Sequence, residues 1–273
     1  MINPRVASIQ MTSNQNVTEN LLIAKEMIQQ AVEQGAQLIV LPEMFAIMGL
    51  DQMDKVKYRE PFGHGPIQDF LQQQAKSHGI WIVGGTIPIA VPNDENKVHA
   101  TCILWNDQGE CVERYDKIHL FDVSLQAGQE TYLESKTTHP GEDVVVIPTP
   151  FGKLGLAVCY DIRFPELFRK MLQHGVEMII LPAAFTYTTG NMHWDVLVRA
   201  RAIENLAYVI TACQTGVHAN GRKTYGHSMI VNPWGEVKAC LLDQPGVLVA
   251  DINLQELHQL RQQFPVLDHR RIG

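Results

Sequence analysis

Apolar residues follow two different periods in the first part of the chain. Residues 5–11 (RVASIQM) alternate between apolar and polar side chains, as in a half-buried β-strand. Residues 16–34 carry apolar side chains at spacings of three and four, the pattern of an amphipathic helix, and Gly35 follows the last turn. Residues 37–41 (QLIVL) form a continuous apolar run that ends at Pro42, which is typical of a buried strand. The pattern predicts a strand–helix–strand unit.

The rest of the first half predicts one more helix and three strands. The expected helix covers residues 66–78, and the expected strands cover residues 80–88, 99–106 and 110–115. Residues 44–65 have no regular period. Residues 116–143 form a long polar loop, and a loop of that length in a compact domain is more often functional than not.

The second half again predicts short apolar strands separated by helices. The expected strands are 143–147, 154–158, 178–181, 208–213, 228–231, 237–241 and 247–252, and the expected helices are 165–174, 194–206 and 254–263. Between these elements, residues 186–193 and 217–224 are expected to be loops. Short strands that alternate with helices favour an α/β protein with parallel sheets.

Two distant segments of the sequence resemble each other. Residues 35–45 (GAQLIVLPEMF) and 175–185 (GVEMIILPAAF) share Gly, Ile, Leu, Pro and Phe at five of eleven positions. Each copy follows a predicted helix that itself follows a predicted strand. The repeat therefore suggests two similar halves related by a pseudo-twofold axis, which would pack sheet on sheet with helices outside, a four-layer αββα sandwich. A chance match between short apolar segments is the alternative.

Composition limits the classes of partner and the compartment. The 273 residues are 45% hydrophobic with a formal net charge of −7, which argues against nucleic acid or an anionic membrane as the main partner. The five cysteines are odd in number and none are spaced C-x-x-C, so neither a disulfide framework nor a thiolate zinc site is indicated. With no signal-peptide pattern and no apolar run of about 20 residues, we expect a single cytoplasmic domain over residues 1–273.

One cysteine lies at a position that suits catalysis. Cys159 follows the expected strand 154–158, and Pro165 fits the first turn of the next helix. The positive end of that helix dipole would favour a thiolate at this place. Position alone leaves the alternative open that Cys159 is a buried structural residue, as most free cysteines are.

Three charged residues are candidates to act with this thiol. Glu43 follows Pro42 at the end of its strand, where the second copy of the repeat has Ala183, so that one strand end offers a carboxylate and another a thiol. Lys117 follows the strand 110–115, and a lysine beside Cys159 would lower the thiol pKa and stabilise an oxyanion. Glu134 is the third and weakest of these charged candidates. The alternative for each is an ordinary solvated charge.

Three motifs taken together resemble the nitrilase superfamily of carbon–nitrogen hydrolases. They are LPEMF at 41–45, YDKIHLFD at 115–122 and GLAVCYDIRFPEL at 155–167. The resemblance extends over nearly the whole chain and implies an αββα sandwich. It also implies a Glu–Lys–Cys triad, which falls on Glu43, Lys117 and Cys159, and a second glutamate, which falls on Glu134. The resemblance implies no metal and no cofactor.

Further motifs resemble the Nit branch of amidases. These are residues 188–205, 225–235 and 264–271, and residues 214–226 resemble enzymes that hydrolyse deaminated glutathione more than omega-amidases acting on 2-oxoglutaramate. The resemblance implies an amide substrate with a carboxylate, a thioester intermediate, and homodimers or larger assemblies through outer helices. Candidate substrate-binding residues are Tyr160, whose N–H would also hold the oxyanion, Arg163, Tyr187, Thr189 and Tyr225. Arg163 has the alternative of pairing with Glu166 or Asp161.

Three rival interpretations make different demands on the sequence. A Cys–His hydrolase of papain type would suit the 11 histidines, but no cysteine lies in C-G-[SA]-C-[WY]. A non-catalytic binding subunit of the same fold would not need Glu43, Lys117 and Cys159 together. A zinc hydrolase is disfavoured because no H-E-x-x-H spacing occurs.

Overall fold

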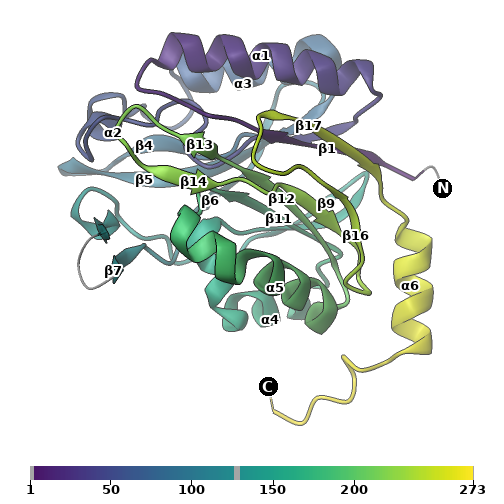
Figure 1. Cartoon of the computed structure of the whole chain (residues 1–273). Helices are drawn as coiled ribbons and strands as arrows, with labels where there is room; N and C mark the ends of the chain where they lie inside the picture. The colour runs from purple at the N-terminus through teal and green to yellow at the C-terminus, as the bar shows by residue number, and fades with distance from the viewer. Residues whose placement is uncertain (1–2, 126–129, 273) are drawn as a thin grey trace.

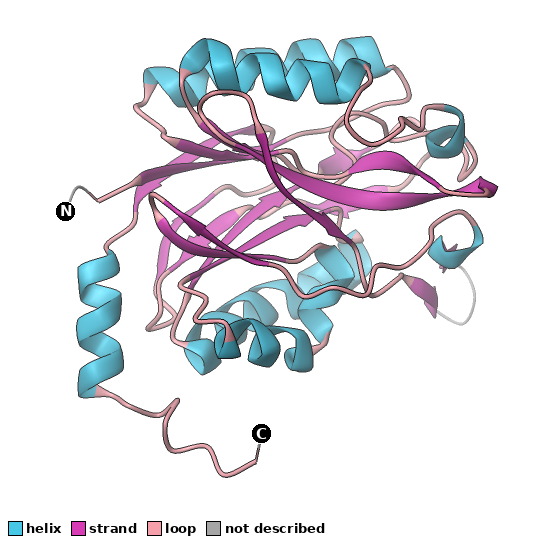
Figure 2. Cartoon of the chain, turned by 180° about the vertical axis from the view of Figure 1, so that it is seen from behind, coloured by secondary structure: helices cyan, strands magenta, loops and turns pink. Residues whose placement is uncertain are grey.

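A computed structural model describes residues 3–125 and 130–272, and within them two β-sheets lie face to face between layers of helices (Figure 1, Figure 2). The first sheet contains, in order, β17 (Gly246–Asp251), β1 (Arg5–Gln10), β2 (Leu38–Val40), β3 (Trp81–Val83), β5 (Asp94–Trp105) and β4 (Ile87–Val91), and β6 (Cys111–Asp116) pairs with β5. The second sheet contains, in order, β16 (Val237–Cys240), β15 (Met229–Val231), β12 (Tyr208–Cys213), β11 (Met178–Ala183), β10 (Gly152–Leu156) and β9 (Val146–Thr149).

The helices cover the outer faces of the two sheets. Helices α1 (Val17–Glu33) and α3 (Pro66–His78) lie over the first sheet, while α4 (Pro165–Gln173) and α5 (Tyr187–Asn205) lie over the second (Figure 1). Helix α6 (Leu254–Gln263) lies at one side of the sandwich. The four-layer αββα sandwich expected from the sequence is therefore confirmed. No helix in the described ranges is long and apolar enough to cross a membrane.

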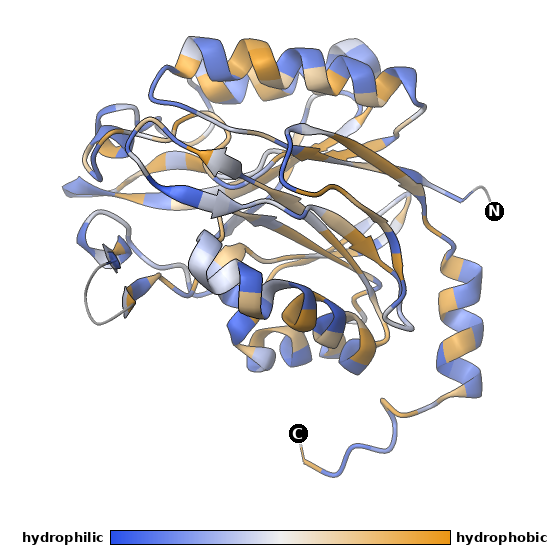
Figure 3. Ribbon diagram, in the orientation of Figure 1, coloured by the Kyte–Doolittle hydropathy of each residue, from blue (hydrophilic) through white to orange (hydrophobic). Residues whose placement is uncertain are grey.

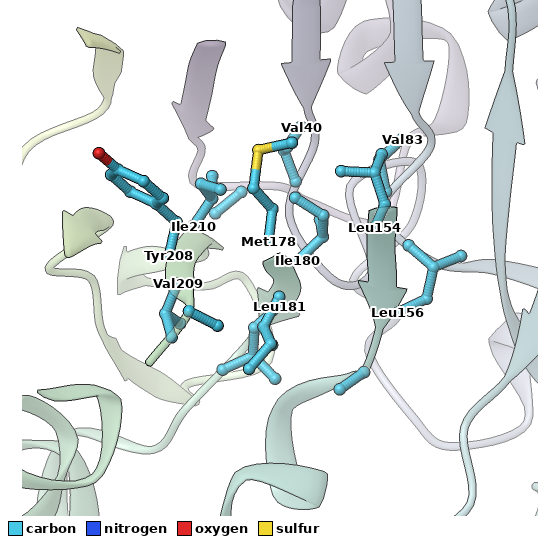
Figure 4. Close-up of a cluster of buried hydrophobic side chains, with 14 of the residues drawn as sticks. Val40, Val83, Leu154, Leu156, Met178, Ile180, Leu181, Tyr208, Val209 and Ile210 are labelled. Carbon is cyan, nitrogen blue, oxygen red and sulfur yellow. The ribbon is translucent and has the colours of Figure 1, made fainter. Parts of the chain in front are cut away.

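The inner strands are apolar on both faces because each face is covered. Val40 of β2 belongs to the core between the sheets, whereas its neighbour Ile39 packs in the cluster beneath α1 and α3. In the second sheet, Met178 and Ile180 point towards Val40, and Leu181 points to the other side of β11 (Figure 4). Figure 3 shows hydrophobic residues along the central strands of both sheets and a mixture on the helices. This double burial explains why these strands are continuous apolar runs rather than alternating ones.

The two halves repeat one parallel unit. Strands β1, β2 and β3 are parallel neighbours linked through α1 and α3, and β10, β11 and β12 are parallel neighbours linked through α4 and α5. The similar segments at 35–45 and 175–185 contain the middle strands of these triplets, β2 and β11. Because the carboxyl ends of parallel strands share one edge of a sheet, residues that follow the strands can meet there.

The helix ends follow from local capping. The Asn16 side chain accepts a hydrogen bond from the Glu19 N–H at the start of α1, and Gly79 ends α3 with φ +61°. Buried Glu60 accepts hydrogen bonds from the Ile67 and Gln68 N–H groups in the first turn of α3. The boundaries expected for α3 and α6 agree with the structure.

Several other expected boundaries are wrong: β5 begins at Asp94 and not at 99, β9 is Val146–Thr149 and not 143–147, and a short helix lies at Asp54–Lys57 within the segment expected to be irregular. Four larger errors concern whole segments. The strand expected at 80–88 is two strands, β3 and β4, with a break at residues 84–86. Gly85 suits this break, because its φ is +55° and a Cβ there would lie 2.1 Å from the Pro42 carbonyl oxygen. The loop at 116–143 contains the hairpin β7 (Asp122–Leu125) and β8 (Glu130–Leu133) and a short 3₁₀ helix, η2 (Glu134–Lys136). The loop at 217–224 is largely a hairpin of β13 (Thr215–Val217) and β14 (Lys223–Tyr225).

The fourth error concerns residues 186–193, which were expected to be a loop. They form the first turns of α5, with the Thr186 hydroxyl capping the Thr189 N–H. Gly190 belongs in this helix for a steric reason, since a Cβ there would lie 2.4 Å from the Tyr225 side chain. The close approach between α5 and the β13–β14 hairpin thus explains why a glycine, which has low helix propensity, occurs in this helix.

Candidate active site

Cys159 lies just beyond β10 in an unusual backbone conformation. Its φ of +48° is in the left-handed region, which costs a non-glycine residue about 1–3 kcal/mol and is most common at functional sites. A 3₁₀ turn, η3 (Cys159–Arg163), separates it from α4, which starts at Pro165. The thiol is buried, with 7% of the residue exposed.

Asp161 holds this turn in place. Its fully buried carboxylate accepts hydrogen bonds from the Val158 N–H (2.8 Å), the Tyr115 hydroxyl (2.7 Å), the His119 N–H (3.0 Å) and the His119 ring Nδ1 (2.7 Å). These contacts join the turn after β10 to β6 and to the segment that follows it. Asp161 thereby ties the backbone around Cys159 to the segment that carries Lys117.

We expect Asp161→Asn to loosen the turn around Cys159. The amide nitrogen of asparagine would face at least one backbone N–H, so about 1–3 kcal/mol of folding free energy should be lost. Misplacement of the thiol should lower kcat by roughly 10- to 100-fold with little change in KM. Thermal unfolding and steady-state kinetics measure both effects. An unchanged kcat in the variant would contradict this positioning role.

Glu43, Lys117 and Glu134 form one buried hydrogen-bonded chain. The Lys117 Nζ donates to Glu43 Oε1 at 2.8 Å and to both Glu134 oxygens at 3.0 and 2.8 Å. The other Glu43 oxygen accepts the Ala184 N–H at 2.7 Å. Glu43 follows β2, Lys117 follows β6 and Glu134 opens η2, so residues distant in sequence meet at one edge of the sheets.

Electrostatics differ from the sequence-based expectation at the thiol. Burial raises the pKa of the Cys159 thiol well above its usual value, and the Glu43 carboxylate adds to the rise, while Lys117 and the Ala184 N–H oppose it. The thiolate expected at this position is therefore disfavoured, because the sulfur is buried beside a carboxylate. A thiol that keeps its proton needs a base to remove it.

Lys117 and Glu134 are both held in their charged forms. Burial alone would lower the pKa of Lys117, but Glu134 and Glu43 raise it well above its usual value. Burial would raise the pKa of Glu134, yet Lys117 and Lys55 bring it below the ordinary range. The ammonium group is thus permanent at neutral pH.

A cavity of about 430 Å³ opens onto these side chains, a size that suits a small-molecule substrate. Glu43, Lys117, Glu134 and Cys159 all line it, together with Tyr160 and Thr189 from the expected substrate-binding set. No histidine of the described residues lines it, so the papain-type alternative has no histidine at this site.

Three other expected substrate-binding residues do not line this cavity in the described structure. The Arg163 guanidinium lies against the Phe185 ring at 5.0 Å and 3.3 Å from His193 Nδ1, without an ion pair to any described carboxylate. The alternative considered for Arg163, a pairing with Asp161 or Glu166, is wrong too, and for Asp161 the reason is that this carboxylate already accepts four hydrogen bonds. Tyr187 is in the first turn of α5 with Lys223 above its ring, and Tyr225 stacks on His227.

Sequence reasoning missed several residues that line the cavity. They include Lys55 on α2 (Asp54–Lys57), Phe121, Glu130, Tyr132 and Arg222. Glu130 and Tyr132 lie in the segment 116–143, which was expected to be a functional loop, but nothing in the sequence indicated these two residues in particular. Lys55 and Arg222 had no local pattern that separates them from solvated charges.

Comparison with known proteins identifies the family. The sequence model of the carbon-nitrogen hydrolase family matches residues 5–262. The chain belongs to this family. Carbon-nitrogen hydrolases act on C–N bonds, so the chain is an amide-hydrolysing enzyme, and the expected nitrilase-superfamily membership is confirmed.

Individual relatives of this carbon-nitrogen hydrolase extend the comparison. The deaminated glutathione amidase of Synechocystis sp. is 44% identical over 97% of both chains. The structure of the C. elegans NitFhit protein superimposes with a TM-score of 0.92 at 36% identity, covering 99% of this chain and 66% of that one. Saccharomyces cerevisiae Nit3, a member of branch 10 of the nitrilase superfamily, superimposes with a TM-score of 0.89 at 31% identity over 99% and 97%.

Proposed function

We propose that this enzyme hydrolyses the amide bond of deaminated glutathione, giving 2-oxoglutarate and Cys-Gly, with Cys159 as nucleophile. The observation that carries the chemistry is the contact between Glu43 and Lys117 beside the Cys159 thiol, since it supplies a base, a cation and a nucleophile in one cavity. The substrate is suggested by the name of the Synechocystis relative, which is similar over nearly its full length.

In the first half-reaction Glu43 takes the thiol proton as the Cys159 sulfur attacks the amide carbon. The oxyanion forms beside Lys117, which is positively charged, and the Tyr160 N–H, one residue after the nucleophile, is the second donor. Glu43 then gives its proton to the leaving amine, the C–N bond breaks, and the acyl group remains on sulfur as a thioester.

In the second half-reaction water replaces the amine. Glu43 takes a proton from this water, the resulting hydroxide attacks the thioester carbon, and the C–S bond breaks as the proton returns to sulfur. Glu134 does not touch the reacting atoms. Its two hydrogen bonds fix the Lys117 ammonium at the oxyanion position, and its Oε2 is itself fixed by the Phe121 N–H at 2.7 Å.

Turnover of two substrates by one enzyme sample tests the proposed function. We expect kcat/KM for deaminated glutathione to exceed that for 2-oxoglutaramate by at least about 10-fold, because the larger substrate makes additional contacts in the cavity. Comparable values on both would favour an omega-amidase. Absence of hydrolysis across a panel of linear amides would favour the non-catalytic binding subunit.

We also propose a homodimer formed through the outer face of α5. A set of large apolar residues is 45–69% exposed on α5 and the neighbouring turn and C-terminal segment: Met192, Val196, Ile203, Trp234 and Phe264. The Trp234 and Phe264 rings lie 5.8 Å apart, so the patch is continuous there. Apolar patches of this kind usually mark an interface. In a twofold-symmetric dimer the patch on each copy would be covered by the same patch on the other copy.

We expect Val196→Glu to convert the dimer to a monomer, because it would place two unpaired charges within an apolar contact. Light scattering after size exclusion should show half the mass of the wild type, and Val196→Ala should remain dimeric. A wild-type protein that is monomeric at micromolar concentration would contradict the proposal.

A reducing compartment such as the cytoplasm is the location we propose. All five cysteines are free thiols, and Cys111 and Cys240 are exposed. Two exposed free thiols, together with the proposed thiol nucleophile, suit an environment that keeps cysteines reduced.

A further inference from the structure

Two cations line the active-site cavity without an acidic partner. Neither Lys55 nor Arg222 has a carboxylate within ion-pair distance among residues 3–125 and 130–272. The third cation of the cavity, Lys117, differs because it contacts both Glu43 and Glu134. Positive charge that can act on a substrate anion therefore resides on Lys55 and Arg222.

Lys55 lies on α2, with only part of its side chain exposed. Its Nζ donates to the Thr138 hydroxyl at 2.6 Å, which uses one of three donors. Burial lowers the pKa of Lys55, Glu134 opposes this, and both Lys117 and Arg222 act in the same direction as burial. An additional anion at this place would hold the lysine in its charged form.

Arg222 lies in the turn between β13 and β14. Its Nη2 donates to the Ala184 carbonyl. Within the described ranges its Nη1 has only the Met44 sulfur at 4.0 Å, and its buried Nε has no acceptor. The guanidinium carbon is 5.4 Å from the centre of the Tyr132 ring. Most donors of this side chain thus have no strong acceptor, although a guanidinium is well suited to bind a carboxylate with two parallel hydrogen bonds.

The fold brings these two cations towards the same space. Asn220, two residues before Arg222, donates to the Gly49 carbonyl at 2.7 Å, and the turn at 49–54 leads into α2 with Lys55. Both side chains line the one cavity, and the Arg222 charge is among the groups that lower the pKa of Lys55, as expected of a like charge nearby. Like charges held together at a cavity wall cost free energy unless an anion lies between them.

The cavity carboxylates other than Glu43 and Glu134 are engaged elsewhere. Glu130 accepts hydrogen bonds from the Thr188 hydroxyl at 2.7 Å and the Tyr132 hydroxyl at 3.1 Å. Asp51 accepts the Met53 N–H at 2.7 Å within its own turn. Neither carboxylate neutralises Lys55 or Arg222.

We propose that Arg222 and Lys55 bind a carboxylate of the substrate that is remote from the amide bond being cut. The inference rests on the proposed function, because deaminated glutathione carries two carboxylates, one on the 2-oxo acid and one on glycine, whereas 2-oxoglutaramate carries only the first. Both carboxylates have the chemistry that this pair recognises. The experiment therefore distinguishes the two sources.

The test compares deaminated glutathione with two analogues that each lack one charge. In the first the glycine carboxylate is a carboxamide, and in the second a methyl group replaces the 2-oxo acid carboxylate. For the wild type we expect kcat/KM to fall by roughly 10- to 100-fold for the analogue that lacks the bound carboxylate. We call the ratio of kcat/KM for deaminated glutathione to kcat/KM for an analogue the penalty for that analogue. In Arg222→Gln and in Lys55→Gln the penalty for the analogue that lacks the bound carboxylate should be less than about 3-fold, while the penalty for the other analogue stays as in the wild type.

Several controls make the outcome specific. Arg222→Lys should restore part of the penalty, and Lys57→Gln, which removes an exposed cation from the same helix, should leave it unchanged. The proposal is overturned if both glutamine variants keep the wild-type penalties, or if Arg222→Gln lowers kcat/KM equally for all three compounds. Equal loss would mean that Arg222 acts only by holding Ala184. Because the penalties are ratios, they stand even if the wild type prefers 2-oxoglutaramate, a result that would overturn the proposed substrate alone.

Discussion

Glu43→Gln should abolish amide hydrolysis while leaving a folded protein with a more reactive thiol. The variant has no base to take the Cys159 proton or to return it to the leaving amine, so kcat should fall by about 10³- to 10⁴-fold. The Glu43 carboxylate raises the pKa of the Cys159 thiol, so its removal should lower that pKa. Alkylation of Cys159 by iodoacetamide should therefore reach half its maximal rate at lower pH than in the wild type.

The combination of these two results separates a base from a structural carboxylate. A merely misfolded site would lose hydrolysis without a downward shift of the alkylation profile. Glu26→Gln, which removes the same charge from the exposed face of α1, is the matched control and should match the wild type in both assays. Hydrolysis by Glu43→Gln at a tenth of the wild-type rate or more would contradict the assignment of Glu43 as the base.

Lys117→Met should have the largest effect on stability. It leaves Glu43 and Glu134 facing each other, buried and without a cation, and loss of one partner from a buried ion pair costs about 3–5 kcal/mol. For a chain of this size that corresponds to a fall in Tm of roughly 10 °C. Loss of oxyanion stabilisation should also lower kcat by at least about 10²-fold.

The pH dependence of unfolding identifies the cause of this loss. The lowered pKa of Glu134 stabilises the wild type above the unfolded value of about 4.3, and this contribution is lost as pH falls. The raised pKa of Lys117 stabilises it below the unfolded value of about 10.4, and that contribution is lost as pH rises through the folded pKa. Wild-type stability should therefore have a plateau between these limits.

In Lys117→Met the contribution of these carboxylates to the pH dependence of folding stability should have the opposite sign at acid pH. The two facing carboxylates repel each other, so a proton bound between them stabilises the folded state. The loss of folding stability relative to the wild type should therefore be smaller at pH 5 than at pH 7. Lys117→Met/Glu134→Gln should recover part of the lost Tm at pH 7. Lys170→Met, an exposed position on α4, controls for loss of one charge. A deficit that is constant with pH would contradict the buried-pair explanation.

Hydrophobic period predicted most of the helices and strands because buried strands and amphipathic helices differ in period. The four layers followed from the internal repeat and from the family resemblance. Hydrophobic period failed where tertiary contacts override local preference. Residues 186–193 look like a loop, yet the cap at Thr186 and the packing of Gly190 on Tyr225 make them helical. At Gly85 the Pro42 carbonyl, which is distant in sequence, comes too close for any side chain, and no local pattern shows such a contact.

Motifs predicted the members of the buried Glu–Lys–Glu chain, but the protonation state of the Cys159 thiol could be derived only from the three-dimensional structure. The pKa of Cys159 depends on burial and on Glu43, and neither follows from its place between a strand and a helix. Lys55 and Arg222 were missed for a related reason. A surface cation and a cation without a partner in a cavity have the same local sequence, and only the surrounding residues tell them apart.

The antiparallel pairing of β17 with β1 has a consequence for synthesis of the chain. Arg5 pairs with Asp251, and Gln10 with Gly246, so one edge of β1 has no neighbour until the segment 246–251, more than 230 residues later, has been synthesised. Throughout translation that bare edge can recruit a strand from another nascent copy. Production in cells should accordingly depend on chaperones that shield it, and a stop codon before residue 246 should yield aggregates instead of a smaller working enzyme.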